Sequence, residues 1–186
     1  ERNNANASPL AEIRPVWLPV RVPISPDPRE WCGARPDADK NALVHCLRVV
    51  FPDKEEFWAG QEEGLRRCLG GMDSLVLLPT GGGKSLIFQM AAFLQPGLTL
   101  VVSPLTSLAE DQVANLARLG VDRAVSISKK TTISGQLETV TERLCGGDFV
   151  LCYIAPERLQ IPDFRHTLEQ VRNQMPIPTV VVDEAH

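Results

Sequence analysis

A glycine-rich segment at residues 78–85, Leu-Pro-Thr-Gly-Gly-Gly-Lys-Ser, constrains the fold of this chain more than any other feature. It follows an apolar run and precedes a segment with helical periodicity, which is the layout of a phosphate-binding loop. Glycines let backbone N–H groups turn toward a polyphosphate, and the helix N-terminus adds a favourable dipole. The strict pattern begins with glycine, but Leu78 stands there in this chain. A glycine-rich turn followed by an unrelated lysine is therefore the alternative interpretation.

Residues 80–85 supply the groups that hold a nucleoside triphosphate in such a loop. The Lys84 ammonium would reach the β- and γ-phosphates, and the Ser85 hydroxyl would ligate Mg²⁺. The residues expected to contact the nucleotide here are Thr80, Gly81, Gly82, Gly83, Lys84 and Ser85.

The segment at residues 179–186 provides a second anchor. Its Thr-Val-Val-Val run is typical of a buried parallel strand, and it ends in the adjacent carboxylates of Asp183 and Glu184. Asp183 would hold Mg²⁺, and Glu184 would orient and polarise the attacking water. A strand followed by an acidic turn is the alternative. The occurrence of both anchors in this order favours the catalytic interpretation, in which Lys84, Asp183 and Glu184 carry the chemistry.

Charge and cysteine content narrow the classes of function. The net charge of −4 and the isoelectric point near 5.4 argue against a broad basic surface for nucleic acid. They are still compatible with a groove that holds a single strand by few contacts. The five cysteines are odd in number and form no C-x-x-C pair, so we expect reduced thiols instead of a zinc site or disulfides. No apolar run is long enough to span a membrane, and we expect no membrane partner.

The chain divides near residue 40. Residues 1–40 contain seven of the fifteen prolines and predict an extended, proline-rich arm or linker. Beyond it, helical and strand patterns alternate, which predicts an α/β fold with a parallel sheet and helices on both faces. We expect helices over residues 41–51, 56–69, 84–94, 107–119, 133–145 and 163–173. We expect strands over residues 74–78, 98–103, 124–127, 149–154 and 179–182.

Taken together, the motifs resemble the RecQ family of superfamily 2 DNA helicases over about residues 51–186. Five strings carry the resemblance: Phe-Trp-Ala-Gly-Gln (57–61), the phosphate loop (78–85), Ser-Pro-Leu-Thr-Ser-Leu-Ala-Glu-Asp-Gln (103–112), Tyr-Ile-Ala-Pro-Glu-Arg-Leu (153–159) and Asp-Glu-Ala-His (183–186). In helicases an apolar residue commonly opens the phosphate loop, which removes the objection raised by Leu78. The resemblance implies that residues 41–186 are the N-terminal part of a RecA-like ATP-binding lobe.

The resemblance also implies roles for residues outside the two anchors. The Gln61 amide would read the adenine edge, although a solvated helix position is its simpler interpretation. His186 would relay the nucleotide state to DNA. The residues expected to contact nucleic acid are Ser103, Pro104, Ser107, Gln112 and Arg158. Helix capping by Ser103 and Ser107, and a surface ion pair of Arg158, are the simpler alternatives. Tyr153 fits the core better than a stacking platform.

One departure marks this chain as a divergent member. The family sandwiches the adenine between an aromatic residue and an arginine, whereas Trp58 and Ala59 replace an Arg-Pro pair here. The base could stack on Trp58 or Phe51. The resemblance further implies that a central strand and a second lobe lie beyond His186, so residues 1–186 alone are expected neither to fold stably nor to hydrolyse ATP.

The expected function is ATP-dependent DNA unwinding, with Mg²⁺-ATP hydrolysis coupled to 3′-to-5′ movement on single-stranded or partly duplex DNA, in the bacterial cytoplasm or the nucleus. One alternative is a relative that acts on RNA or translocates on duplexes. Another is a nucleotide-gated DNA-binding scaffold in a defence or DNA-modification complex, with protein partners that the sequence does not specify.

Overall fold

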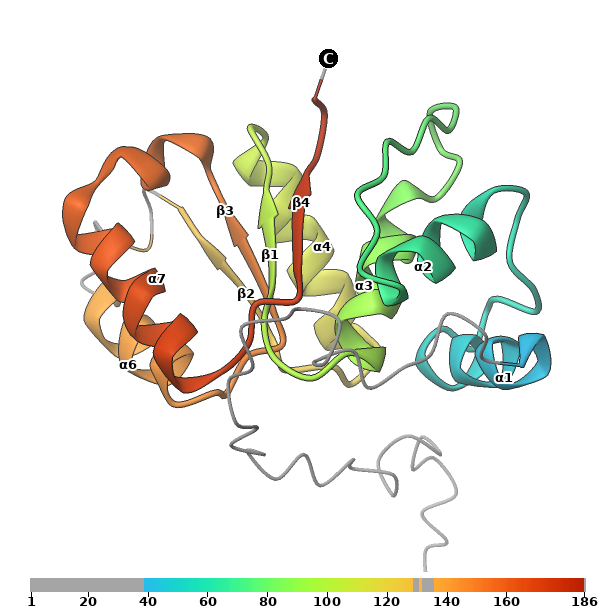
Figure 1. Cartoon of the computed structure of the whole chain (residues 1–186), viewed down its shortest axis with the longest axis horizontal. Helices are drawn as coiled ribbons and strands as arrows, with labels where there is room; N and C mark the ends of the chain where they lie inside the picture. Colours follow the sequence, from blue (N-terminus) through green and yellow to red (C-terminus); the bar gives the residue numbers. More distant parts are fainter. Residues whose placement is uncertain (1–38, 129–130, 132–135, 186) are drawn as a thin grey trace, which may run out of the picture.

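The computed structural model describes residues 39–128, 131 and 136–185 of the chain, and within them it contains a four-stranded parallel sheet (Figure 1). The strand order is β2-β3-β1-β4, and β1 pairs with both β3 and β4. The strands are β1 (Thr99–Val102), β2 (Ala124–Ile127), β3 (Leu151–Ile154) and β4 (Thr179–Val182). The predicted parallel α/β fold is therefore confirmed. Residues 1–38 of the predicted arm lie outside the described residues, and so does His186.

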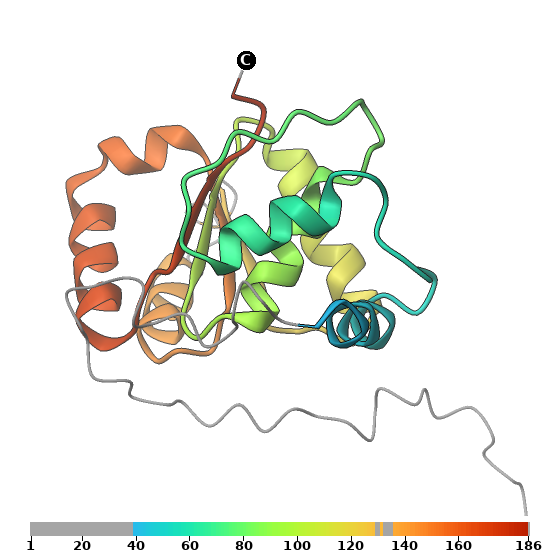
Figure 2. The same ribbon diagram turned by 45° about the vertical axis from the view of Figure 1, so that its right-hand side comes forward.

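Helices cover both faces of the sheet, as Figures 1 and 2 show from two directions. On one face lie α1 (Lys40–Val50), α2 (Gln61–Leu69), α3 (Lys84–Leu94) and α4 (Thr106–Arg118). On the other lie α6 (Leu137–Cys145) and α7 (Pro162–Gln174), the latter preceded by the 3₁₀ turn η3 (Pro156–Gln160). The two faces enclose two separate hydrophobic clusters.

Strand β1 shows how the sheet divides the core. Val101 belongs to the cluster under α3 and α4, whereas Leu100 and Val102 belong to the cluster under α6 and α7. This alternation arises because successive side chains of a strand point to opposite faces. A strand that is buried on both faces is apolar throughout, which explains why β1 and β3 were recognisable from sequence.

Most element boundaries agree with the sequence to within one or two residues, and α2 is the clearest exception. It begins at Gln61 and not at residue 56, because Gly60 adopts a left-handed backbone conformation (φ 83°) at the position before the helix. The start predicted at residue 133 for the helix corresponding to α6 falls outside the described residues.

The strand predicted over residues 74–78 is not formed, which corrects the sequence expectation. The segment has the alternating exposure of a strand: Val76 and Leu78 pack on the core, whereas Leu75 and Leu77 are 80% and 83% exposed. A strand also needs a neighbour for its backbone groups, and this segment pairs with no strand among the described residues. Local sequence therefore set its side-chain pattern, but not its pairing.

The sequence predicts a buried strand at residues 179–182, but one face of β4 is apolar and exposed, which corrects that expectation. Val180 and Val182 are 60% and 63% exposed, and β4 pairs only with β1 within the described part of the chain. No described helix is long and apolar enough to cross a membrane.

Candidate active site

The phosphate loop connects the extended segment at residues 74–78 to α3. Gly81 and Gly83 adopt left-handed conformations (φ 76° and 72°), and the Gly82 N–H donates to the Pro79 carbonyl (2.9 Å). A Cβ atom at Gly83 would collide with the Gln61 side-chain amide. The glycines are therefore required by backbone conformation and by close packing, as the loop motif predicts.

Lys84 and Ser85 form the first turn of α3 and are both half-buried. The Lys84 ammonium donates to the Leu78 carbonyl (3.4 Å), at the beginning of the loop. This contact keeps the positive charge inside the curve of the loop. The N–H groups of the first helical turn add to the same positive potential. The segment thus has the charge and shape needed for phosphate groups.

Gln61 lies behind the loop and not on an open surface. It is buried; its side-chain carbonyl accepts from the Trp58 N–H (2.8 Å), and its amide donates to the carbonyls of Gly82 (3.1 Å) and Gly83 (3.3 Å). The simpler interpretation, a solvated helix residue, is therefore wrong. In this structure Gln61 joins the Trp58 segment to the phosphate loop, and its contact with adenine stays a prediction.

Trp58 is the aromatic side chain exposed beside this junction, at 53% exposure. The Lys54 ammonium lies 5.4 Å from the centre of its ring, within range of a cation–π interaction. A flat, exposed ring with a cation on its face can receive a base by stacking. Nothing in the sequence pattern singled out Lys54, because the contact depends on how the connection between α1 and α2 folds back.

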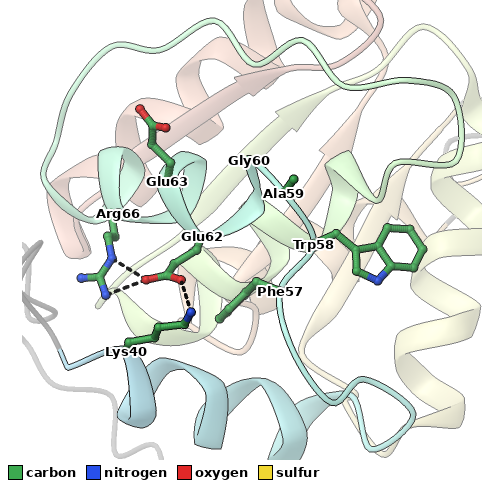
Figure 3. A pocket seen from close by; sticks show the side chains of 8 residues that line it. All are labelled: Lys40, Phe57, Trp58, Ala59, Gly60, Glu62, Glu63 and Arg66. Carbon is green, nitrogen blue, oxygen red and sulfur yellow. Dashed lines mark hydrogen bonds and ion pairs between the residues drawn. The ribbon is translucent and has the colours of Figure 1, made fainter.

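A surface pocket of about 410 Å³ lies on the side of this segment nearer α1 (Figure 3). Glu62 bridges Arg66 (2.8 Å) and Lys40 (3.8 Å) within it, while Trp58 points away from these three side chains. Lys40, Glu62 and Arg66 therefore satisfy one another, and we do not assign the pocket to the nucleotide.

Asp183 and Glu184 follow β4 at the carboxyl end of the sheet. The Asp183 N–H donates to the Val102 carbonyl (2.9 Å), which continues the pairing of β4 with β1 past the strand end. Glu184 has a left-handed conformation (φ 53°), which costs a non-glycine residue on the order of 1 kcal/mol. Its N–H donates to the Asp183 carboxylate (3.1 Å).

Electrostatics links the two anchors of the site. Burial and the Glu184 carboxylate raise the pKa of Asp183, while the Glu184 N–H and the Lys84 ammonium oppose the shift. Lys84 and Asp183 therefore lie close enough to interact. The rise comes mainly from burial, which disfavours the charged carboxylate, and a divalent cation at this position would favour the charged form. Asp183 and the Ser85 hydroxyl are oxygen ligands of the kind Mg²⁺ prefers, so the residues fit that ion.

The segment at residues 103–107 lies at the same carboxyl edge, where the chain leaves β1 and enters the first turn of α4. Ser103 is buried, and its hydroxyl has no hydrogen-bond partner among the described residues. Pro104 and Ser107 are exposed. Leu105 occupies the cap position of α4 without a side-chain hydrogen bond, so the alternative that a serine caps this helix is not supported. Pro104 and Ser107 form the exposed part of the predicted nucleic-acid contact.

Gln112 and Arg158 do not lie on that surface. Gln112 is 9% exposed and accepts a hydrogen bond from the Tyr153 hydroxyl (2.8 Å). Arg158 is 6% exposed and donates to the Ser128 carbonyl (2.6 Å). Both are long polar side chains whose groups are bonded inside the protein. We therefore assign them structural roles and leave them out of the proposed DNA surface. Tyr153 is fully buried, as expected.

The family model for DEAD/DEAH box helicases matches residues 58–186, which include the phosphate loop and the acid pair. The chain belongs to the DEAD/DEAH box helicase family.

RecQ-type helicases are among the relatives of this DEAD/DEAH box chain. It is 37% identical to ATP-dependent DNA helicase RecQ of Pasteurella multocida, over 79% of the chain and 22% of the relative. It is 38% identical to the probable ATP-dependent DNA helicase RecS of Bacillus subtilis, over 70% of the chain and 25% of the relative. It is 36% identical to ATP-dependent DNA helicase Q-like 5 of Arabidopsis thaliana, over 83% of the chain and 16% of the relative. The chain thus spans about a quarter or less of these relatives.

These matches confirm the RecQ-like resemblance. The parallel sheet and its flanking helices correspond to a RecA-like helicase lobe.

Proposed function

We propose that this chain is the ATP-binding part of a RecQ-type DNA helicase that couples Mg²⁺-ATP hydrolysis to 3′-to-5′ movement on single-stranded DNA. The main support is that one helicase-family match, over residues 58–186, includes both the phosphate loop and the strand-end acids, and that Lys84 is close enough to Asp183 to lower its pKa. Relatives that are named ATP-dependent DNA helicases support the substrate class. A location in the bacterial cytoplasm or the nucleus follows from that substrate.

Each residue of the site has a defined task in this proposal. The loop from Thr80 to Gly83 surrounds the phosphates with N–H groups, and Lys84 offsets the charge that develops on the transferred phosphoryl group. Mg²⁺, when bound, supplies further positive charge at the phosphates, and Ser85 and Asp183 are its proposed ligands. Glu184 orients the attacking water and accepts its proton. Trp58 stacks on the adenine, with Gln61 holding Trp58 against the loop.

Strand displacement by the full-length protein tests this function. We expect ATP-dependent unwinding of a duplex with a 3′ single-stranded overhang, and much weaker unwinding when the overhang is 5′. The Glu184→Gln variant is the matched control, because the amide has the same shape but cannot accept the proton. Unwinding that prefers the 5′ overhang, or that continues without ATP, would overturn the proposal.

The acidic charge of the chain favours a second candidate, a nucleotide-gated DNA-binding scaffold. With a net charge of −4, the chain lacks the positive charge excess of many nucleic-acid-binding domains. A scaffold would bind DNA in an ATP-dependent manner, with its protein partners, and would displace no strand. Replacing the DNA substrate by RNA in the same assay distinguishes the RNA-directed alternative.

A further inference from the structure

Three buried polar side chains from different elements meet on the face of the sheet that α3 and α4 cover. They are Gln89 of α3, Gln112 of α4 and Tyr153 of β3. The Tyr153 hydroxyl donates to the Gln112 carbonyl oxygen (2.8 Å), and the Gln89 amide donates to the same oxygen (3.2 Å) and to the Tyr153 hydroxyl (3.2 Å). The three hydrogen bonds form a closed triangle, which we call the Gln–Tyr network.

The network keeps the same donors and acceptors over the physiological pH range. Burial raises the pKa of the Tyr153 hydroxyl, the hydrogen bond with Gln89 lowers it, and the negative charge of Asp183 raises it further. The hydroxyl therefore stays protonated and remains a donor. Because the Asp183 charge affects the pKa of Tyr153, the network lies within electrostatic reach of the strand-end acids.

Packing does not explain why polar residues occupy these positions. Helix α3 is otherwise apolar after its first turn, with six other buried residues between Leu86 and Ala92. A hydrocarbon side chain would fill the Gln89 position without the cost of burying an amide. A fully bonded polar network instead restricts the relative placement of the elements that it joins, because its bonds are directional.

The elements joined by the network lead to different parts of the candidate site. Helix α3 begins at Lys84 of the phosphate loop, α4 begins just after Pro104, and β3 leads into the turn at Pro156–Gln160. A shift of α4 against α3 would break at least one bond of the triangle. The network therefore joins the helix that carries the proposed DNA surface to the helix that begins at the phosphate loop.

We propose that Gln89, Gln112 and Tyr153 are positioning residues that couple DNA contact at the N-terminus of α4 to ATP turnover at the phosphate loop. This inference rests on the proposed function, because it requires that DNA stimulate ATP hydrolysis. None of the three residues touches nucleotide or DNA. They act by fixing α4 and β3 relative to α3.

The test is Tyr153→Phe in the full-length protein, with ATP turnover measured with and without single-stranded oligo(dT). This substitution removes one hydroxyl and leaves the Gln89–Gln112 bond available. We expect DNA stimulation to fall by about 3- to 10-fold, the size of effect that is typical of residues that modulate coupling. Turnover without DNA, and the Kd for oligo(dT), should each change by less than about twofold, because the residue lies in neither site.

Thr99→Val is the matched control. The Thr99 hydroxyl is also buried in the sheet, on neighbouring β1, but it has no hydrogen-bond partner among the described residues. Its removal should leave DNA stimulation unchanged. Gln89→Met serves as a second variant, since it keeps the side-chain volume and removes the donor, and it should reproduce the effect of Tyr153→Phe.

The outcomes separate this inference from the function on which it rests. Wild-type protein that shows no stimulation by oligo(dT) would overturn the DNA-stimulated helicase and the coupling together. Normal wild-type stimulation that Tyr153→Phe and Gln89→Met both retain would overturn the coupling alone. An equal loss in Thr99→Val would assign the effect to general loosening of the core and would also overturn it.

Discussion

The side-chain amide of Gln61 donates a hydrogen bond to the backbone carbonyl of Gly82, 3.1 Å away in the phosphate loop. The side-chain carbonyl of Gln61 accepts a hydrogen bond from the Trp58 N–H. One buried side chain therefore fixes the proposed adenine-stacking residue relative to the loop. The residue that the sequence assigns to base recognition therefore also supports the loop that holds the phosphates.

Gln61→Glu tests this support. A carboxylate cannot donate to the Gly82 and Gly83 carbonyls and would repel them, so we expect the KM for ATP to rise by about 10-fold or more. Gln95→Glu is the matched control, because Gln95 is also buried and donates to the Cys68 carbonyl (3.0 Å) away from the loop. It should lower the melting temperature and leave KM unchanged. An equal rise of KM in both variants would contradict the assignment.

Lys84→Ala should abolish ATP turnover in the full-length protein, with a loss of about 100-fold or more. The ammonium is positioned at the loop by the Leu78 carbonyl, and alanine removes the charge while it keeps the helix. Steady-state phosphate release is the measurement. Lys54→Ala removes a charge from the nearby Trp58 ring and should retain hydrolysis. Turnover by Lys84→Ala at the wild-type rate would refute the role of the loop.

Glu184→Gln should bind ATP with unchanged affinity and lose hydrolysis, because the amide is isosteric but cannot accept the proton of water. Equilibrium binding of a fluorescent ATP analogue, compared with phosphate release, separates the two effects. A variant that fails to bind ATP would show that Asp183 and Glu184 have been assigned the wrong roles.

Cys152 should resist alkylation in the folded protein. Burial raises the pKa of its thiol to about 12 from an ordinary value of 9.0, so the native state keeps the proton and excludes the reagent. Iodoacetamide at pH 8, followed by peptide mass analysis, should modify the half-buried Cys46 before Cys152. Modification of both at equal rates would show that the sheet opens readily.

The same shift fixes the sign of a pH effect on stability. Between pH 9 and about 12 the folded state binds a proton that the unfolded state has released, so the free energy of unfolding should fall as pH rises through that window. The contribution is fully present below pH 9. Urea unfolding of Cys152→Ala, compared with wild type at pH 8 and pH 10.5, should show the smaller pH dependence in the variant.

Several features of this protein were determined by local sequence. The glycines at positions 81 and 83 are required by backbone conformation, and the apolar runs of β1, β3 and β4 identify strands of a parallel sheet. Hydrophobic periodicity and local composition predict these features because both depend only on residues that are neighbours in the sequence. The family followed from the same short strings.

Tertiary structure decided which polar residues are exposed and which segments pair. Gln112 and Arg158 belong to motif strings, but long-range packing buries both. Residues 74–78 alternate like a strand, yet they pair with none in the described part of the chain, because a strand requires backbone partners that its own sequence does not provide. Sequence thus determined the residue types at the site. Contacts between distant elements, which follow no local pattern, decided which of them face the nucleotide and which hold the core together.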